Sequence, residues 1–437
     1  MTSTAWPGKN NWTYAQKIAF RFVFIYFLLY IAPWTWLAYI PGADFIVNIY
    51  NNWVYQAVEA ANGLFSQFKE LVSPNGSGDT SYNWVQVELY LLLSVLGCII
   101  WSLLDPKRTQ YNRLAYWFRI TVRYFVIITC FGYGIIKLFM LQMPFPNLSQ
   151  LATPLGDYAP MRLSWMFLGY SKTYQFFSGA MEFLAGSLLL FRRTATLGAL
   201  LAAGVFANVM IMNLSYDIPV KLYSTHLFVA CLLLLAFEHK RISAFLFLNQ
   251  PTTAGNLYQV RFPKKWMRTA RIVLKSLFIA GIVVMPFINN YARYVEVNNP
   301  REIRPIRPGI YNVAVFVLNQ DTVPPLITDS LRWQDVIFEK GGSGSIATTD
   351  TTFWQRYRRG YFSYSADTVK QEIEFKKSNV RRESQSLFRL RYELPDSNTI
   401  RLRGTIGKNT LYAELRKSNR YFQLPERQFH WLSEYNR

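Results

Sequence analysis

The sequence predicts a polytopic α-helical membrane protein followed by an all-β antiparallel domain. The 437 residues are 51% hydrophobic and 17% aromatic, yet the mean hydropathy is only +0.07. The apolar residues are therefore unevenly distributed. Nearly all the long apolar runs fall between about residues 17 and 290, whereas the chain from Asn298 onward alternates apolar with polar residues. This contrast indicates a membrane unit joined to a polar, β-rich domain.

Seven stretches approach the roughly 20 apolar residues that a hydrocarbon core of ~30 Å requires. The first stretch is long and lacks a small-residue cleavage site, so we expect a signal anchor. The fourth and sixth stretches are short, and the seventh contains Pro286. If the count were wrong by one span, the C-terminal domain would lie on the other side of the membrane. The seven predicted spans cover residues 17–40, 84–104, 118–141, 173–191, 195–213, 221–237 and 271–288.

Basic residues in the short loops predict the orientation of these spans. Lys107 and Arg108 precede the third span and Arg192 follows the fourth, whereas the loop at 41–83 has only Lys69. We therefore expect a multi-pass protein of the bacterial inner membrane with a cytoplasmic N-terminus. With seven spans, the C-terminal domain is extracytoplasmic.

Four regions follow from the spans. Residues 1–117 hold two transmembrane helices, 118–248 a four-helix unit, 249–297 a basic cytoplasmic loop with the seventh span, and 298–437 the extracytoplasmic β-rich domain. Between the first two spans, apolar residues recur at helical spacing, which predicts an amphipathic helix along the outer membrane face or over the bundle. These residues are Phe45, Ile49, Trp53, Ala57, Ala60 and Leu64.

The positions of the charges and of the cysteines argue against binding of nucleic acid, a metal site and a structural disulfide. Much of the formal charge of +21 lies in the predicted cytoplasmic loops, where anionic lipid headgroups account for it, so we expect membrane lipids and no nucleic acid as partners. Cys98, Cys130 and Cys231 each lie inside a predicted span, and the sequence has no Cys/His cluster. We therefore expect neither a metal site nor a structural disulfide.

Glu182 is the only charged residue in the apolar run QFFSGAMEFLAGSLLLF. Its neighbours on a helix are Ser178, Gly179, Ala185 and Gly186, so it stands on the smallest face of its helix. Membrane helices use small residues where backbones approach closely. We expect this face to turn toward other helices, with Glu182 protonated or paired.

Four polar residues on consecutive spans are predicted to converge in the outer half of one bundle. Counted from the outer end of each span at roughly 1.5 Å per residue, Lys137 lies about 6 Å deep, Asn208 about 8 Å, His226 about 9 Å and Glu182 about 14 Å. Other interpretations remain open: Lys137 can snorkel to the interface, His226 can be a hydrogen-bonded core residue, and the whole set can be a structural lock between helices.

Three motifs, YGIIK, GAMEFLAGSLLLFRRTATLGALL and NLSYDIPVKLYSTHLFVACLLLLAF, carry a resemblance to a known family. With them, the block from about 118 to 238 resembles the DoxX-like membrane proteins, which are compact four-helix units. The family's glutamate matches Glu182, its lysine after YG matches Lys137, and its polar turn matches Asp217 and Lys221. Members of the family have been associated with quinone-linked thiosulfate oxidation. This chain departs from the family by adding two spans before the unit and one after it.

Two functions from different classes remain as hypotheses. In the first, the protein is an oxidoreductase subunit that binds a quinone or a small anion, with Glu182 as proton acceptor and Lys137 or His226 holding the oxyanion. Substrate contacts are then expected from Asn208, Asp217, Lys221 and Tyr133. In the second, the polar set only fixes helix packing, and the protein is a non-enzymatic scaffold whose β domain binds a protein partner or lipid. Transport of a small solute is a weaker third interpretation.

The C-terminal segment shows strand periodicity. Runs such as IYNVAVFVL, EIEFKK and LRYEL alternate apolar with polar residues, and LPDSNT and IGKN are hairpin turns. About eight antiparallel strands predict an up-and-down barrel or a sandwich. The start at Gly309 and Tyr311 resembles lipocalin-like domains, which implies a cavity or groove. His430 is the only histidine in this segment of the sequence, and Ser433 alone does not make a hydrolase, so we interpret the domain as a binding or docking module.

Overall fold

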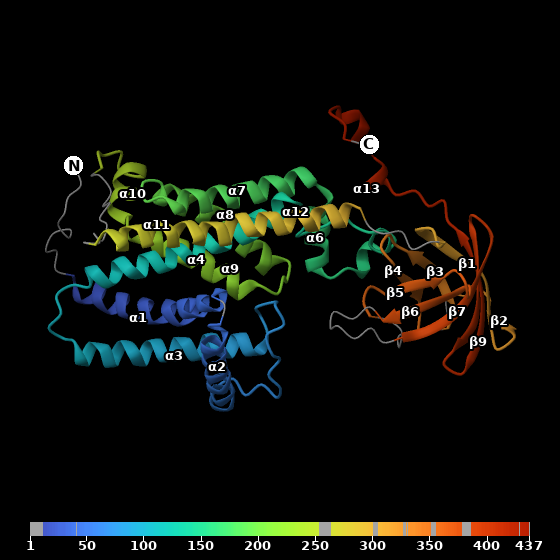
Figure 1. Ribbon diagram of the computed structural model, residues 1–437, viewed down its shortest axis with the longest axis horizontal. Coiled ribbons are helices and arrows are strands. Elements are labelled where there is room, and N and C mark those ends of the chain that lie inside the picture. Colours follow the sequence, from blue (N-terminus) through green and yellow to red (C-terminus); the bar gives the residue numbers. More distant parts are fainter. Residues whose placement is uncertain are drawn as a thin grey trace. The chain divides into compact units, whose positions relative to one another are not determined.

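The computed structural model describes residues 12–40, 42–252, 264–299, 305–326, 329, 331–350, 355–377, 386–427 and 429–436. The chain forms two compact units, and each is built from two separate parts of the sequence. The helical unit comprises Met1–Gln142 and Thr173–Tyr291, and the β unit comprises Met143–Lys172 and Ala292–Arg437 (Figure 1). The chain thus leaves the helical unit, contributes a segment to the β unit, and returns.

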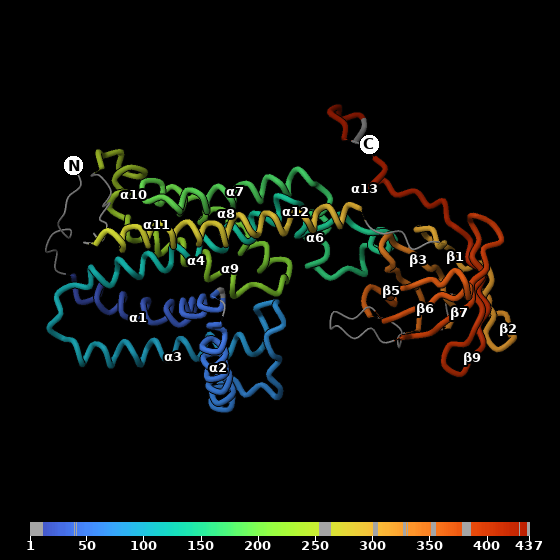
Figure 2. Tube along the Cα trace, viewed as in Figure 1, coloured from blue at the N-terminus to red at the C-terminus, as the bar shows by residue number. Residues whose placement is uncertain are grey.

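Long helices form the first unit and run side by side, as the chain trace shows (Figure 2). Capping boxes at Thr13 and Thr80 begin α1 and α3. The helices and short helical turns of this unit are α1 (Tyr14–Ile31), η1 (Pro33–Tyr39), α2 (Asp44–Leu64), α3 (Ser81–Leu104), α4 (Asn112–Leu138), α7 (Lys172–Leu190), α8 (Ala195–Ser215), α9 (Lys221–Ala236), α10 (His239–Leu246), α11 (Lys265–Ile279), the π-helical turn η3 (Ala280–Val284) and α12 (Met285–Asn298).

Five helical segments in the described part of the chain are long and apolar enough to cross a membrane. They are Tyr14–Ala38, α3, α4, α8 and the continuous helix Lys265–Asn298. The pair α9 and α10 would make a sixth, although it bends by 81°. Helix α7 forms where the fourth span is predicted but lies outside this set, so seven spans remain a prediction. Pro286 does not end the last helix, because the π-helical turn η3 precedes it.

The amphipathic helix predicted between the first two spans is α2, which lies across the direction of α1 and α3 (Figure 1). Its contact with α3 uses Val58 and Ala61 against Tyr82 and Val85. The predicted apolar stripe points elsewhere: Trp53 is 68% exposed. The helix therefore packs on the bundle through one face and presents a second apolar face outward, as an interfacial helix does.

The β unit is a closed antiparallel barrel, which decides between the predicted barrel and sandwich. In the described residues the strand order is β2-β1-β3-β4-β5-β6-β7-β8-β9, and β1 also pairs with β9, so eight strands close and β2 extends β1. Closure pairs each of these eight strands on both sides in the described residues, and only the short β2 has one neighbour. The strands are β1 (Gly309–Leu318), β2 (Asp321–Thr322), β3 (Trp333–Phe338), β4 (Ser343–Thr348), β5 (Arg359–Asp367), β6 (Glu372–Lys377), β7 (Ser386–Asp396), β8 (Thr399–Ile406) and β9 (Asn409–Lys417).

Aromatic side chains fill the barrel interior. Phe338, Phe362 and Phe375 are at most 1% exposed, and their rings pack edge to face or tilted against one another. An eight-stranded barrel is just wide enough to be filled in this way or to hold one small ligand. These rings lie in the barrel interior, where the lipocalin-like resemblance implies a cavity or groove.

The segment between α4 and α7 packs on the outer face of the barrel. It contains α5 (Leu148–Leu151), η2 (Leu155–Asp157) and α6 (Pro160–Tyr170). Ala152 packs against Ile310 of β1 and Ile337 of β3, so two outward-facing strand residues are buried. The chain ends with α13 (Gln423–Glu426) and η4 (Ser433–Asn436). The segment between α4 and α7 belongs to the β unit, whereas the sequence predicts it as part of the four-helix unit at 118–248.

Candidate functional site

Glycines bring α4 and α7 into close contact. A Cβ added at Gly179 would lie 2.7 Å from the Cβ of Lys137 and 2.8 Å from the carbonyl oxygen of Gly134. A Cβ at Gly134 would lie 2.9 Å from the backbone nitrogen of Phe183. Only glycine fits at such distances, so the predicted small face of α7 does turn toward another helix. This contact places Lys137 beside Glu182.

Lys137 and Glu182 form a buried ion pair. The Lys137 Nζ donates a hydrogen bond to Glu182 Oε1. Lys137 is 7% exposed and Glu182 is 1% exposed. The second carboxylate oxygen, Oε2, is buried and has no hydrogen-bond partner. A buried carboxylate needs nearly all its acceptor capacity satisfied, so this oxygen is available to a proton or to a hydrogen-bond donor.

Two further residues of α4, Tyr133 and Cys130, lie near the pair of Lys137 and Glu182. Tyr133 is 37% exposed, and its ring lies 6.4 Å from that of Tyr223. Both Tyr133 and Cys130 lie near enough to Glu182 to interact with it electrostatically. Of the two states expected for Glu182, protonated or paired, the structure has the paired one, with Lys137 as the partner and Tyr133 nearby.

His226 is not part of this pair but binds α9 to α1. Its Nδ1 lies 2.6 Å from the Leu222 carbonyl oxygen, and its Nε2 lies 2.5 Å from the Tyr26 hydroxyl. Because a carbonyl only accepts, Nδ1 carries the proton and Nε2 accepts from Tyr26. The Tyr30 ring stacks on the imidazole at 3.8 Å. Both ring nitrogens are used, which corresponds to the core-histidine interpretation and not to the predicted catalytic role.

Asn208 is also separate from the site, because it lies on the exposed face of α8. The buried face of that helix carries Phe206 and Asn213, and position 208 falls roughly 200° around the helix from 206. The buried polar residue on α8 is instead Asn213, whose side chain reaches the Val220 carbonyl oxygen at 3.5 Å. The predicted convergence of four polar residues thus reduces to two.

Asp217 and Lys221 pair with each other at 2.7 Å and belong to the start of α9. The backbone N–H groups of Lys221 and Leu222 donate to the Asp79 carboxylate at 2.6 and 2.9 Å. Asp79 therefore caps α9 from a distant loop, where a carboxylate also suits the helix dipole. Sequence reasoning missed Asp79 because its loop PNGSGDTSYN carries no sign of the helix it caps.

Arg21 is a second buried charge that sequence reasoning missed. It is 1% exposed and donates to the Tyr111 hydroxyl at 2.7 Å, the Ser102 hydroxyl at 2.7 Å and the Asp105 carbonyl oxygen at 3.0 Å. It thus ties α1 to the end of α3 and the start of α4. The available signal was a lone arginine inside the first apolar run.

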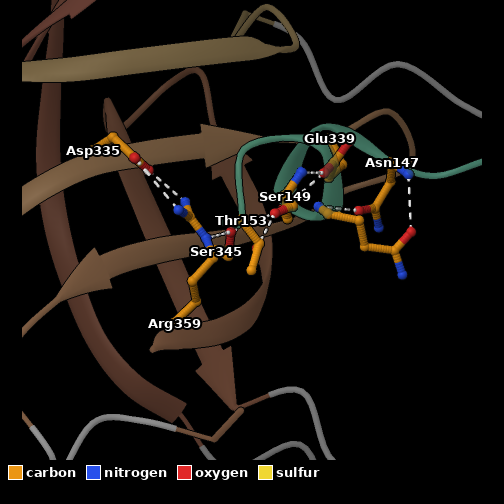
Figure 3. Close-up of polar contacts among 8 residues, drawn as sticks. Asn147, Ser149, Thr153, Asp335, Glu339, Ser345 and Arg359 are labelled. Atoms are coloured by element: carbon orange, nitrogen blue, oxygen red, sulfur yellow. Dashed lines mark hydrogen bonds and ion pairs between the residues drawn. The ribbon is translucent and has the colours of Figure 1, made fainter. Parts of the chain in front are cut away.

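The β unit holds a different buried polar network, shown in Figure 3. The backbone N–H and the hydroxyl of Ser149 both donate to Glu339 Oε1 at 2.8 Å, and the Leu148 N–H reaches Oε2 at 3.3 Å. Ser345 donates to the Ser149 hydroxyl oxygen at 2.8 Å. In turn, Arg359 Nε donates to Ser345 at 2.8 Å.

Each hydroxyl in this network has its partners. The Arg359 guanidinium also binds both carboxylate oxygens of Asp335, and Thr153 donates to the Ser149 carbonyl oxygen at 2.7 Å. Ser149 and Ser345 are at most 1% exposed. The hydrogen bonds run in one direction from guanidinium to carboxylate, so the Ser149 and Ser345 hydroxyls each donate one hydrogen bond and accept another. The network is a lock that holds the segment Met143–Lys172 on the barrel.

Comparison with known proteins adds a relative without an assigned activity. No protein family and no solved structure matches the chain. The chain is 34% identical over 134 residues to the Bacillus subtilis (strain 168) protein YwoB, whose name is given as uncharacterized. The match covers 82% of YwoB and 30% of this chain.

The chain belongs to the YwoB family. Because the match covers most of YwoB but under a third of this chain, most of the present sequence lies outside the matched stretch. YwoB carries no functional description, so membership alone assigns none. The DoxX-like resemblance remains a prediction, and in the described residues no group of His, Cys, Asp and Glu could hold a metal ion.

Proposed function

We propose that this chain is a DoxX-like integral membrane protein, a subunit of an oxidoreductase that binds a quinone-type carrier or a small anion at Lys137 and Glu182. The observation that carries the proposal is the buried and unpartnered Oε2 of Glu182. A hydroxyl of a reduced quinone can donate to this oxygen. Lys137 already lies beside it and supplies a positive charge for an oxyanion.

The chain supplies binding and proton transfer in this scheme. Glu182 accepts the proton of the bound hydroxyl, and Lys137 stabilises the oxygen that loses it. Oxidation of a bound quinol also releases two electrons, and a redox centre of another subunit would have to accept them. His226 and Asn208 do not take part, because His226 is saturated by Tyr26 and Leu222 and Asn208 is exposed.

The connectivity of the β unit supports the proposed membrane topology. Since Met143–Lys172 and the chain from Ala292 fold together, both lie on one side of the membrane, so the chain between them crosses an even number of times. Helix α8 and Lys265–Asn298 are candidates for two of these crossings. Helices α7 and α9 therefore either both cross or both do not. If Tyr14–Ala38, α3 and α4 are three earlier crossings, either case predicts that the N-terminus and the barrel are on opposite sides of the membrane.

Cysteine labelling tests this topology in a bacterial inner membrane. Arg108→Cys, between α3 and α4, should be protected from a membrane-impermeant maleimide in intact spheroplasts, and Lys408→Cys, in the hairpin of β8 and β9, should react. The native cysteines are buried. Equal labelling at both positions would contradict the topology.

The test of the site is the set of small molecules that co-purify with the protein. Wild type and Glu182→Gln, in mild detergent and matched for thermal unfolding, are extracted and compared by mass spectrometry. We expect a quinone or a defined anion in the wild type and its loss in the variant. Asn208→Ala is the matched control, since Asn208 is exposed and should leave the bound molecule unchanged. Identical phospholipid-only extracts would contradict the proposal.

A second candidate function is a non-enzymatic scaffold whose extracytoplasmic barrel binds a protein partner or a lipid. The apolar core inside the barrel favours it, because a partner would then bind at the outer surface. The outer face of β6 to β9 carries alternating arginines and glutamates, including the pairs Arg389 with Glu374 and Arg416 with Glu414. In this case Glu182→Gln changes thermal stability and leaves partner binding intact.

A further inference from the structure

A basic cluster lies at one end of the helical bundle, where α4 begins, α7 ends and α11 runs past both (Figure 1). Its members are Arg123 on α4, Arg192 directly after α7, and Arg271 and Lys275 on α11. Lys275 interacts electrostatically with the other three, and Arg123 also interacts with Arg192. Cations from three elements are thus gathered in one place.

Aromatic rings hold two of these cations in position. Arg192 donates to the Tyr116 hydroxyl at 2.9 Å and lies 5.8 Å from the centre of that ring. The Lys275 ammonium lies 5.5 Å from the centre of the Phe191 ring. Cation–π contacts orient a cation but leave its charge in place. The cluster therefore remains strongly positive.

Arg123 is the member that points to a ligand. Its Nε is buried and has no hydrogen-bond partner. The guanidinium lies 5.6 Å from the Tyr124 ring, which packs at 5.1 Å against Phe278 of α11. The Arg123 guanidinium at the contact between α4 and α11 thus has one unused hydrogen-bond donor. A buried donor without an acceptor lowers the stability of the folded state.

In the residues that the structure describes, no carboxylate forms an ion pair with Arg123. Glu238 is the acidic residue nearest along α9 and α10, and it already pairs with Arg119 and Arg241. In the described part of the chain no carboxylate lies within ion-pair distance of Lys275. Like charges held together in a medium of low dielectric constant repel one another. An external anion would remove this cost.

We propose that Arg123 and Lys275, with Arg192 beside them, bind a phosphate group at this end of the bundle. Guanidinium groups bind phosphate oxygens through paired hydrogen bonds, and an ammonium adds a point charge. The phosphate comes either from the headgroup of an anionic phospholipid or from free phosphate. The lipid source is favoured by Leu274 and Leu277 of α11, which are 66% and 63% exposed and could contact acyl chains. This site is independent of Lys137 and Glu182.

Thermal unfolding of the delipidated protein in a non-ionic detergent tests the proposal. The probes are phosphatidylglycerol, phosphatidylcholine at the same concentration, and sodium phosphate against sodium chloride at equal ionic strength. We expect phosphatidylglycerol to raise the Tm and phosphatidylcholine not to. A rise with sodium phosphate would support the same site with free phosphate as the source.

Lys275→Gln should weaken the apparent affinity for the phosphate-bearing probe about fivefold, because one basic residue contributes ~1 kcal/mol to such binding. Arg123→Gln is the second variant, and Arg268→Gln, a basic residue of the same helix outside the cluster, is the matched control. Equal stabilisation by both lipids and no effect of sodium phosphate would overturn the proposal. An equal response of Lys275→Gln and Arg268→Gln would also overturn it.

Discussion

The two units each bury a charged network, but they satisfy it to different degrees. In the helical unit, Lys137 and Glu182 share one hydrogen bond, and one carboxylate oxygen has no partner. In the β unit, Arg359 binds both oxygens of Asp335 and a serine hydroxyl that itself has further partners. A saturated network fixes structure, whereas an unsaturated one leaves a group that can still react or bind. Burial alone therefore does not separate a lock from a site.

Arg359→Met should have the largest effect on stability, because the saturated network loses its only cation. We expect a loss of about 3 to 5 kcal/mol, since the partly buried Asp335 carboxylate and the fully buried Ser345 hydroxyl oxygen would lose the donor that Arg359 provides. The measurement is chemical unfolding followed by tryptophan fluorescence, with Trp333 inside the barrel as a reporter. Arg391→Met, at an 80% exposed side chain, is the control and should change stability by less than about 0.5 kcal/mol. Similar values for both variants would contradict the assignment of Arg359 as a lock.

Lys137→Met should cost about 3 kcal/mol, because it leaves the Glu182 carboxylate buried without a counter-charge. The double variant Lys137→Met with Glu182→Leu should regain most of that loss, since no buried charge remains. Thermal unfolding of the two single variants and the double variant gives the coupling energy. A double variant that loses the sum of the single effects would show that the two side chains do not interact in the folded protein.

Gly179→Ala should destabilise the helical unit by about 1 to 3 kcal/mol, because the new methyl group would meet the Lys137 side chain and the backbone of α4. Gly132→Ala is a matched control on α4 itself, where nothing lies within 4 Å of the added Cβ. It should be neutral or stabilising through helix propensity. If both variants have the same Tm, the close glycine contact is not what holds α4 to α7.

The smallest effect is expected at an exposed ion pair of the barrel. Hydrogen bonds from Arg389 and Lys376 lower the pKa of Glu374 from 4.5 to about 2. A carboxyl group whose pKa is lower in the folded state stabilises the protein above its unfolded pKa and loses that contribution as the pH falls from about 4.5 toward 2. Thermal unfolding of wild type and Glu374→Gln should therefore differ slightly at pH 6 and converge near pH 2. A difference that grows on acidification would contradict this sign.

The sequence predicted Lys137 and Glu182 because each interrupts an apolar run, and Glu182 also lies on the small-residue face of its helix. It failed for Asn208, because the depth of a residue along a helix does not determine which face it occupies. For His226 it offered two interpretations, and only the contacts with Tyr26 and Leu222 decide between them.

The strands of the barrel were predictable for a local reason, since alternation along each strand is visible in the sequence. Closure was not, because a sandwich has the same alternation and only the pairing of β1 with β9 distinguishes the two. The lock was also invisible. Ser149 and Glu339 are separated by 190 residues, and polar residues in polar surroundings give no signal.

The split origin of the β unit has a consequence for protein synthesis. Ser149 leaves the ribosome 190 residues before Glu339, which at ribosomal rates of about 5 to 20 residues per second corresponds to roughly 10 to 40 s. During that interval Ala152 lacks its contacts with Ile310 and Ile337. Until β1 and β3 have been synthesised, the segment with Ser149 and Ala152 therefore has no barrel to pack against. The nascent chain is most accessible to proteases and chaperones in that interval.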